Sequence, residues 1–469
     1  MTHGGTTRER PPCDVAVVGA GWAGCAAAVT LADAGVCVTL LEQAPALGGR
    51  ARRVVLDGLA LDNGQHLLVG AYHATLALMD RVHGATRART LVHRLPLTMR
   101  PLGGPGPGRV SLTAWRAPAP FHLAGGILTA AGLGWHERAA LARGFRGLQR
   151  AGFTCPPEMT VAELFRSAPP RVFAALWEPL CLAALNTPPA RASARMFCSV
   201  LRDTFTGRAA NSDFLVPAAD LGTLFPDAAA AFVRDRGGIV RTGVTVRGVL
   251  PARDGVDVSV GDGSETFTAA IVAVGPHQLA AALGRDAAAS GVGRSTVAQT
   301  GAFTYESITT VYLAYAGTVA LPSRLARLDD APGQWAFDRT AALRPAAAGG
   351  AQALLAVVIS ANGPHDALAH SALTAAVDAQ LRRLAARLPA LVWSRVIAER
   401  RATYACAPAL TRPGAGRIAP GVYLAGDYTD DEFPATLVAA TRSGVAAARG
   451  VLADLAAASS RRPGPLPER

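Results

Sequence analysis

The sequence predicts an α/β fold in which a parallel sheet contains an inserted antiparallel meander, joined to a discontinuous α+β domain. Three observations lead to this prediction. An apolar run at residues 15–18 precedes a glycine-rich turn and an alanine-rich segment. Residues 239–275 alternate apolar and polar side chains, and residues 421–455 have the pattern of a strand, a Gly-Asp turn and a long helix. Strands that alternate with helical segments are typical of parallel sheets.

The composition sets limits on the function. The chain has 469 residues, half of them apolar and 17% charged, so it has room for two or three domains and is too apolar for a disordered or fibrous protein. Its 46 basic and 34 acidic side chains give a net charge of +12, and every basic residue is arginine. Without lysine, Schiff-base and P-loop lysine chemistry are excluded. The arginines are scattered and not interleaved with aromatic residues, which argues against binding of nucleic acid.

Cysteine usage and the N-terminus indicate a location. Seven cysteines, at positions 13, 25, 37, 155, 181, 198 and 406, form no CxxC pair, which favours a reducing cytoplasm and no metal site. Residues 1–12 show no signal peptide, and the prolines and glycines of residues 117–136 favour a surface or core segment over a spanning helix. We therefore expect a cytoplasmic protein.

The glycine-rich turn has the features of a Rossmann-type, dinucleotide-binding domain. Gly19, Gly21 and Gly24 form GxGxxG between the first strand and a helix. Gly19 allows the tight turn, Gly21 lets the backbone approach a pyrophosphate, and Gly24 lets the helix pack on the strand. A second strand at 36–41 closes on Glu42, whose carboxylate can accept hydrogen bonds from both ribose hydroxyls of adenosine. A lone GxGxxG is common by chance, but this context favours an adenine dinucleotide without a 2′-phosphate.

The residues after Glu42 indicate which dinucleotide is bound. Gly48, Gly49 and Arg50 follow it, and this pairing resembles that of flavin-dependent amine oxidases and phytoene desaturases. In those families the GGR segment flanks the FAD pyrophosphate, with the arginine close to phosphate oxygens. An ordinary Gly-Gly turn is the alternative interpretation. The resemblance implies FAD rather than NAD.

The alternating segment 239–275 has turn signals at Asp254-Gly255 and Asp262-Gly263, which predict a short antiparallel meander. The same families insert such a meander in the Rossmann fold, and there a valine at its start contacts the adenine through its backbone. Val246 is the matching position, although on sequence alone it is simply a core strand residue.

The C-terminal segment carries the last cofactor motif. Residues 421–427 predict a strand that ends in the turn Gly426-Asp427, and a long helix follows Thr436. In the FAD families the aspartate contacts the ribityl or phosphate region, and the helix N-terminus faces the flavin and stabilises negative charge on its reduced form. A plain N-terminal helix signal is the alternative for Asp427. The residues expected to bind FAD are Gly19, Ala20, Gly21, Trp22, Ala23, Gly24, Glu42, Gln43, Gly48, Gly49, Arg50, Asn63, Gly64, Gln65, His66, Val246, Gly426, Asp427 and Thr436.

The order of the motifs divides the chain into two interleaved domains. The pieces expected to form the FAD-binding domain are 10–100, 211–275 and 401–455. The pieces expected to form the substrate-binding domain are 101–210 and 276–400. The ends, 1–11 and 456–469, are polar or rich in proline and arginine and are expected to be flexible tails.

Further segments resemble one family within the flavin amine oxidase superfamily, which includes the amine oxidases and phytoene desaturases. Residues 62–72 (DNGQHLLVGAY), 182–190 (LAALNTPPA) and 401–444 (with RATYACAP, LAGDYTDDEFPAT and TRSG) resemble the hydroxysqualene dehydroxylases, or squalene-associated FAD-dependent desaturases. The resemblance extends along nearly the whole chain. Two positions depart from the family: Val438, where an acidic residue is usual, and residues 431–434, where TGLP is common. Both departures concern the shape of the substrate pocket.

The resemblance implies that reduced FAD converts hydroxysqualene to squalene, in squalene and hopanoid biosynthesis. A C30 alcohol needs a long apolar tunnel and is collected from a membrane because it is almost insoluble in water. An acid would help the allylic hydroxyl leave as water while the flavin delivers hydride. The partners implied are this isoprenoid, membrane lipid and other squalene-pathway enzymes.

The catalytic acid is expected between residues 62 and 66, because this segment runs past the isoalloxazine in related flavoproteins. Asp62, Gln65 and His66 are the candidates, and His66 comes first because histidine titrates near neutral pH. A structural histidine bonded to the backbone is the alternative. Tyr404 and Tyr428 are weaker candidates, since an isolated tyrosine is usually a packing residue with its hydroxyl at the surface.

Residues 111–150 suggest contact with a membrane. An apolar stretch at 121–135 precedes a helical segment with arginines at positions 138, 143, 146 and 150. Apolar surface flanked by arginines suits peripheral docking on the inner face of the cell membrane. A solvated basic helix that covers the core is the alternative.

Three other functions are compatible with these patterns. A phytoene or carotenoid-type desaturase would use oxidised FAD on a polyene of similar size, and only DNGQH and ALNTPP favour the dehydroxylase over it. An amine oxidase usually needs an aromatic cage and often a lysine-bound water, which the absence of lysine disfavours. A nucleotide-stabilised scaffold or lipid carrier would have no catalytic role.

Overall fold

The computed structural model describes residues 14–106, 108–329, 331–343, 348–385 and 387–460. Its largest feature is a six-stranded sheet in the order β10–β2–β1–β14–β21–β20. The bounds of these strands are β1 (Asp14–Val18), β2 (Cys37–Leu41), β10 (Ile239–Arg241), β14 (Ala269–Val272), β20 (Gly416–Ala419) and β21 (Val422–Leu424). All neighbours are parallel except β20, which runs antiparallel to β21. The predicted parallel Rossmann-type sheet is therefore confirmed.

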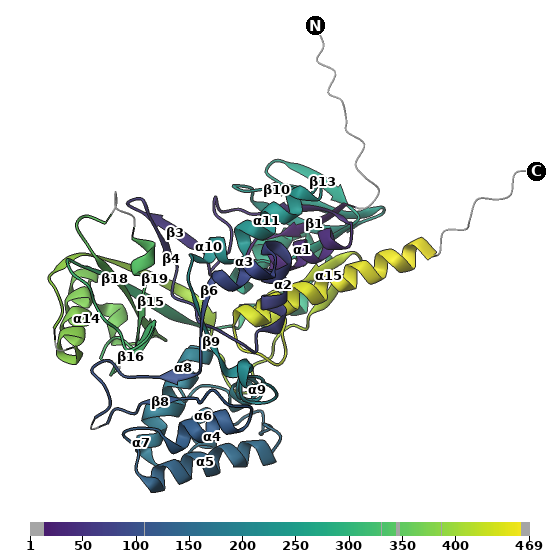
Figure 1. Ribbon diagram of the computed structural model, residues 1–469. Helices are drawn as coiled ribbons and strands as arrows, with labels where there is room; N and C mark the ends of the chain where they lie inside the picture. The colour runs from purple at the N-terminus through teal and green to yellow at the C-terminus, as the bar shows by residue number, and fades with distance from the viewer. Residues whose placement is uncertain (1–13, 107, 330, 344–347, 386, 461–469) are drawn as a thin grey trace, which may run out of the picture.

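Helices cover this sheet. Both faces of β1 are buried, which explains its unbroken apolar run. Helix α1 (Trp22–Asp33) packs against α11 (Pro226–Asp235) and α15 (Leu437–Ser460). In Figure 1 the long α15 lies alongside α2 (His73–His83) and projects away from the molecule at its C-terminal end.

The prediction that all of residues 239–275 form the meander is wrong at both ends of this range. Only β11 (Val246–Ala252), β12 (Gly255–Val260) and β13 (Gly263–Phe267) form the antiparallel unit, joined at the two predicted Asp-Gly turns. The flanking strands β10 and β14 belong to the parallel main sheet. Buried and more accessible residues alternate in the first part of β12, whereas every residue of β14 is buried, because β14 lies between two neighbouring strands of the main sheet.

A second, antiparallel sheet has the order β16–β17–β18–β15–β19. Its strands are β15 (Tyr305–Tyr315), β16 (Leu325–Arg327), β17 (Trp335–Asp338), β18 (Ala353–Ser360) and β19 (Leu391–Tyr404). Helix α14 (His370–Leu384) covers one face, where Val311 and Leu313 contribute to the core. Because side chains alternate along a strand, Tyr312 points to the opposite face, toward the first domain.

A helical unit lies at the end of the molecule farthest from the main sheet (Figure 1). Its helices are α4 (Phe121–Leu128), α5 (Trp135–Arg150), α6 (Val161–Leu164), α7 (Pro170–Val172), α8 (Glu178–Leu185) and α9 (Ala194–Phe205). A short π-helical segment (Phe173–Trp177) joins α7 to α8. Within the residues described, no helix is long and apolar enough to cross a membrane.

Short ribbons and helices connect these parts. The ribbon strands are β3 (Arg53–Leu56) with β4 (Leu59–Asp62), β5 (Leu68–Val69) and β6 (Val92–Leu95) with β9 (Phe214–Pro217), and β7 (Thr98–Met99) with β8 (Leu112–Thr113). The remaining helices are α3 (Ala85–Thr90), α10 (Leu221–Leu224), α12 (Leu279–Ser290) and α13 (Arg294–Gly301).

The chain ends and domain limits differ in part from the sequence expectation. Helix α15 continues to Ser460, so residues 456–460 are not a tail; their alanines and serines allow the helix to continue. Residues 1–11 and 461–469 lie outside the described part of the chain. The boundary predicted at 400/401 falls inside β19, and the division into two domains stays a prediction.

Candidate functional site

A single cavity of about 1110 Å³ extends from the main sheet to the helical unit. At one end it is lined by the glycine-rich turn and by the start of the meander, including Val246. At the other end it is lined by side chains of α8, α9 and the second sheet. Of the residues expected to bind FAD, all line this cavity except Ala20 and Gly24.

The glycine-rich turn is built as the sequence predicts. Gly19 has a φ of +98°, and a Cβ there would lie 2.7 Å from the carbonyl oxygen of Ala273. Gly24 lies against the turn so closely that a Cβ would be 1.8 Å from the carbonyl oxygen of Gly19. Gly21 is the N-cap of α1 and has no side chain to bond the first N–H groups of the helix. The start of α1 lines the cavity. Free backbone N–H groups at a helix N-terminus attract phosphate oxygens.

Glu42 is fixed in place by backbone groups. Its Oε2 accepts a hydrogen bond from the backbone N–H of Ala20 at 2.7 Å, and its Oε1 accepts one from Ala44 at 2.8 Å. Ala20 therefore acts by orienting the carboxylate rather than by lining the cavity. Each carboxylate oxygen retains acceptor capacity for a ribose hydroxyl.

The GGR segment lies directly against the glycine-rich turn. Gly48 forms a parallel bridge with Gly21, and its N–H donates to the carbonyl of Ala20 at 2.8 Å. Gly49 has a φ of +62°, and a Cβ there would lie 3.2 Å from the Cα of Gly21. The two glycine backbones thus form one surface without side chains, against which a pyrophosphate can lie closely.

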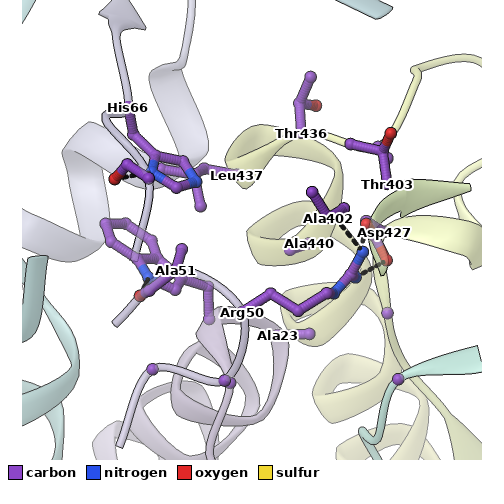
Figure 2. A pocket seen from close by; sticks show the side chains of 18 of the residues that line it. Ala23, Arg50, Ala51, His66, Ala402, Thr403, Asp427, Thr436, Leu437 and Ala440 are labelled. Atoms are coloured by element: carbon purple, nitrogen blue, oxygen red, sulfur yellow. Dashed lines mark hydrogen bonds and ion pairs between the residues drawn. The ribbon is translucent and has the colours of Figure 1, made fainter. Parts of the chain in front are cut away.

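Arg50 connects the two ends of the sequence. Its Nη2 donates to both carboxylate oxygens of Asp427 at 2.7 Å, and its Nη1 donates to the carbonyl of Ala402 at 2.8 Å (Figure 2). Asp427 is 5% exposed, whereas the Arg50 side chain is 27% exposed, so the acidic partner of this ion pair is buried and the basic one is partly accessible from the cavity. The pair holds a positive and a negative group at the centre of the cavity wall, where the predictions placed the phosphates and the ribityl chain.

These residues fit an FAD molecule. The open helix N-terminus and side-chain-free glycine surface suit a pyrophosphate, and the Glu42 carboxylate suits an adenosine ribose. The backbone N–H of Gly426 is held by Ser443 at 2.9 Å, and Thr436 and Leu437 bring the start of α15 to the cavity wall. That helix start is where a positive dipole end can act on the flavin ring.

Asp62 does not reach the cavity, in contrast to its predicted catalytic role. Its Oδ2 accepts a hydrogen bond from Arg339 at 2.9 Å and its Oδ1 accepts one from the backbone of Leu221 at 2.8 Å. The side chains of Asp62 and Arg339 are 2% and 5% exposed. Burial raises the pKa of Asp62 to about 6, although Arg339 and the Leu221 N–H favour its charged form. Asp62 is a structural ion-pair residue.

The rest of this segment does line the cavity. Asn63 donates through Nδ2 to the Arg50 carbonyl and to Glu399, both at 3.0 Å. Gln65 donates to the Tyr312 hydroxyl at 2.7 Å, and that hydroxyl donates to the Asp62 carbonyl at 2.9 Å. The loop is thereby attached to the second sheet.

His66 faces the start of α15 across the cavity (Figure 2). Its Nδ1 lies 3.2 Å from the carbonyl oxygen of Gly64, so this nitrogen carries the proton and Nε2 is an acceptor in the neutral ring. Burial lowers the pKa of His66 to about 4, and the nearby Arg50 charge acts in the same direction. The near-neutral titration for which His66 was chosen is therefore not found in this structure. A neutral imidazole can orient a hydroxyl but is a poor proton donor.

The two tyrosines are buried, contrary to the expectation that their hydroxyls reach the surface. Tyr404 and Tyr428 are both 0% exposed. The Tyr404 hydroxyl accepts from Arg412 at 2.8 Å. The Tyr428 hydroxyl finds no hydrogen-bond partner among the described residues, and neither tyrosine is among those that line the cavity.

The family-like segments meet in space. Asn186 ends α8 with a φ of +48°, and its Nδ2 donates to the Thr403 hydroxyl at 3.0 Å. Thr187 Oγ1 accepts from the backbone of Cys406 at 3.0 Å. Asn186 and Thr403 both line the cavity and were missed as site residues, although the sequence LAALNTPP and RATYACAP marked their neighbourhoods.

The far end of the cavity is apolar. The side chains there come from α8, α9 and three strands; they include Leu180, Phe197, Leu201, Phe205, Phe214, Trp335, Phe337 and Val358. Sequence patterns could not distinguish these from core residues, because both are apolar with helical or strand spacing. Among the described lining residues, the only acids are Glu42, Glu399 and Asp427, all at the end where FAD is expected. This apolar end suits a hydrocarbon chain.

Comparison with known proteins decides the family. The family model of flavin containing amine oxidoreductases matches residues 22–452, which is nearly the whole described chain. The chain belongs to this family. FAD is accordingly its cofactor, and the enzyme is a flavin-dependent oxidoreductase.

Two relatives and one solved structure add detail to this flavoenzyme. It is 29% identical over 459 residues to hydroxysqualene dehydroxylase from Rhodopseudomonas palustris, covering 94% of this chain and 98% of that protein. It is 55% identical over 51 residues to carotenoid 3,4-desaturase from Haloarcula japonica, covering 11% and 10% of the two chains. The crystal structure of an oxidoreductase from Methanosarcina mazei is similar in fold, with a TM-score of 0.68, 15% identity and coverage of 94% and 100%.

Proposed function

We propose that this flavoenzyme reduces hydroxysqualene to squalene, in the squalene and hopanoid route. The observation that carries the proposal is the form of the cavity, which joins the FAD site to an apolar end without an acidic side chain among its described residues. A C30 alcohol matches such a cavity because it offers one hydroxyl and a long hydrocarbon chain. The near full-length likeness to a hydroxysqualene dehydroxylase supports the same substrate.

The reaction replaces a C–OH bond by a C–H bond and releases water. Reduced FAD, when bound, supplies the hydride, and one proton is consumed with the leaving hydroxyl. The apolar wall excludes bulk water, which protects an electron-poor allylic carbon from hydrolysis. Burial and the charge of Arg50 favour the neutral form of His66, so its Nε2 orients the hydroxyl as an acceptor.

The Asn186 amide and the Thr403 hydroxyl, which also line the cavity, complete the polar part of the site. Thr403 accepts a hydrogen bond from Asn186, which leaves its own proton free to be donated into the cavity. Asn186 is itself fixed because its Oδ1 accepts from the backbone of Ala361 at 2.7 Å. This arrangement offers the substrate oxygen a donor and an acceptor from separate walls.

The decisive test is an anaerobic reaction with photoreduced enzyme. Addition of hydroxysqualene should reoxidise the flavin and yield squalene by mass spectrometry. Phytoene added to oxidised enzyme serves as the comparison, because the local likeness to a carotenoid 3,4-desaturase supports a desaturase as the second candidate. Absence of flavin reoxidation by hydroxysqualene would refute the proposal, and reduction of oxidised flavin by phytoene would establish the second candidate.

A further inference from the structure

The helical unit carries an apolar surface that the site does not use. Of the eight large apolar side chains exposed in the described part of the chain, four lie within residues 115–135. They are Trp115, Phe121, Leu128 and Trp135, with exposures of 48%, 67%, 51% and 70%. Single exposed apolar residues are common on protein surfaces, but a cluster of this kind marks a binding surface.

Helix α4 presents part of this cluster on one face. Phe121, Ala124 and Leu128 follow the spacing of a single helix face and all are exposed. Trp115 packs on the same helix, since a Cβ on Gly125 would lie 2.1 Å from its indole ring. The indole Nε1 donates to Thr129 at 3.1 Å. Trp115 is therefore held against α4 while part of its ring stays open to solvent.

Helix α5, which contacts α4, carries a basic outer face. Trp135, Arg143, Arg146 and Arg150 fall within an arc of about 80° and are exposed, whereas Leu141 and Leu148 are buried. Trp135 begins the helix, and the Arg138 guanidinium stacks over its ring at 4.9 Å.

Glu137, the acidic residue of α5, does not offset the positive charge of these arginines. Glu137 accepts a hydrogen bond from the backbone of Gly134 at 2.8 Å and lies 3.6 Å from Arg171. The outer face of α5 therefore keeps its positive charge.

We propose that this surface docks on an anionic lipid bilayer. The docking surface consists of Trp115, Phe121, Leu128 and Trp135, together with the three exposed arginines of α5. Tryptophan rings settle at the interface between headgroups and hydrocarbon, and arginines beside them attract anionic headgroups. The complementarity of charge selects a bilayer over an apolar protein partner.

The docking surface adjoins the apolar end of the cavity. Phe145 on the inner side of α5 packs against Phe205, with ring centroids 5.6 Å apart, and Phe205 lines the cavity. At the edge of the docking surface, Trp115 and His122 line a separate groove of about 470 Å³. Both ring nitrogens of His122 lack a partner among the described residues, although the ring is only 2% exposed.

One thin wall separates this groove from the cavity. Pro96 and Asp213 line the groove, and the next residues in the chain, Leu97 and Phe214, line the cavity. A bilayer on the docking surface would thus lie one strand away from the apolar end of the cavity, where a hydrocarbon substrate must arrive.

The test measures binding of the FAD-loaded enzyme to vesicles without any substrate. Vesicles of phosphatidylcholine with phosphatidylglycerol should bind the enzyme, and pure phosphatidylcholine should bind it much less. The triple variant R143E/R146E/R150E should lose at least about a hundredfold in the partition coefficient, because each basic residue near an anionic surface contributes about fivefold and the introduced acids are repelled. The variant F121S/L128S should also bind at least about tenfold less, through loss of buried apolar area.

Matched variants with the same changes elsewhere act as controls. R87E/R89E/R253E alters the net charge equally, and V55S/L368S removes two exposed apolar side chains; both should bind as the wild type does. Flavin absorbance and thermal unfolding show whether each variant is folded. The proposal is overturned if anionic vesicles do not bind the wild type, or if the docking-surface variants bind as the controls do.

Light scattering tests the remaining alternative, in which a second copy of this chain covers the docking surface. If F121S/L128S instead dissociates an oligomer and leaves vesicle binding unchanged, the surface is an interface between copies of this chain and the proposal fails. Because no substrate is present, the outcome is independent of whether hydroxysqualene is turned over.

Discussion

At the scale of single residues, burial governs two groups of the segment 62–66 in opposite ways. It lowers the pKa of His66 to about 4 and raises that of Asp62 to about 6, because each charged form loses hydration. For His66 the unfolded chain binds a proton more readily, so this contribution to stability is lost as pH falls from about 6.5 toward 4.

The first prediction concerns His66. Because its pKa lies near 4, the enzyme should show no ionisation of this residue in kcat between about pH 6 and 8. H66Q should therefore have a pH profile of the same shape as the wild type, with kcat lowered by about tenfold or less through loss of orientation. The rate of single-turnover flavin reoxidation, measured across this pH range for both proteins, tests the prediction. An inflection near pH 6.5 that only the wild type shows would contradict the prediction and restore His66 as an acid.

The second prediction concerns the buried ion pair of Asp62 with Arg339. D62N leaves the arginine charge buried without its partner and should lower the free energy of unfolding by about 3–5 kcal/mol. The double variant D62N/R339M removes both charges and should recover part of that loss. Denaturant unfolding of the two variants and the wild type measures it. A double variant less stable than D62N would show that the ion pair is not the source of the effect.

Residue roles could be predicted where the chemistry is local. Gly24 and Glu42 contact Gly19 and Ala20 of the same βαβ unit, so their spacing from the turn indicated their roles. The partner of Asp62 could not be found in this way, because Arg339 is 277 positions away and arrives from another sheet. The same holds for Asn186, whose place in the cavity wall depends on Thr403 in β19.

At the scale of elements, the joint between β1 and α1 depends on how closely backbones approach. A methyl group at Gly24 would meet the Gly19 carbonyl at 1.8 Å, whereas one at Gly21 would have 3.9 Å to its nearest neighbour, the Cα of Gly49. Gly21 also has a φ of −69°, which alanine adopts without strain. Gly24 is therefore needed for packing of the helix against the turn, whereas Gly21 is needed for space beside the cofactor.

The third prediction uses this difference. G24A should prevent α1 from packing against the glycine-rich turn and should yield unfolded or aggregated protein. G21A should fold with the stability of the wild type when FAD is absent, but its methyl group occupies the pyrophosphate path, so FAD should bind about tenfold or more weakly. Circular dichroism and flavin titration of each variant measure the two effects. FAD affinity in G21A equal to that of the wild type would place the pyrophosphate elsewhere.

Element types were easier to predict than their partners. The Asp-Gly turns of the meander were found from sequence, yet β10 and β14 were assigned to the wrong sheet. Strand pairing is decided by which elements pack on each face, and the alternating pattern of 239–275 carries no information about a parallel neighbour such as β1.

At the scale of the whole molecule, the cavity results from packing between parts that are separate in the chain. Its apolar end combines α8 and α9 with the second sheet, while its polar end comes from the main sheet. No sequence pattern distinguishes an apolar residue beside an empty space from one in a filled core. The tunnel could therefore be expected only from the substrate that the family resemblance implied.

The fourth prediction tests this division of the cavity. Ala184 lines the apolar end, and A184W would fill part of that end without touching the glycine-rich turn. FAD content should stay at the level of the wild type, while turnover of hydroxysqualene should fall by about tenfold or more because the chain no longer fits. A184V is the matched smaller change and should retain most activity. Equal turnover by A184W and the wild type would show that the substrate lies elsewhere.

The ion pair of Arg50 with Asp427 joins positions that are 377 residues apart. A ribosome delivers the glycine-rich turn early and the Gly-Asp turn near the end of synthesis, so the nascent chain holds only half of a flavin site for most of translation. Strand β21 and helix α15 also come from this last segment, and β14 lacks one of its two neighbouring strands until β21 emerges. We therefore expect flavin to be captured by the released polypeptide, with the supply of cofactor at that moment determining how much of the newly made chain reaches its final state.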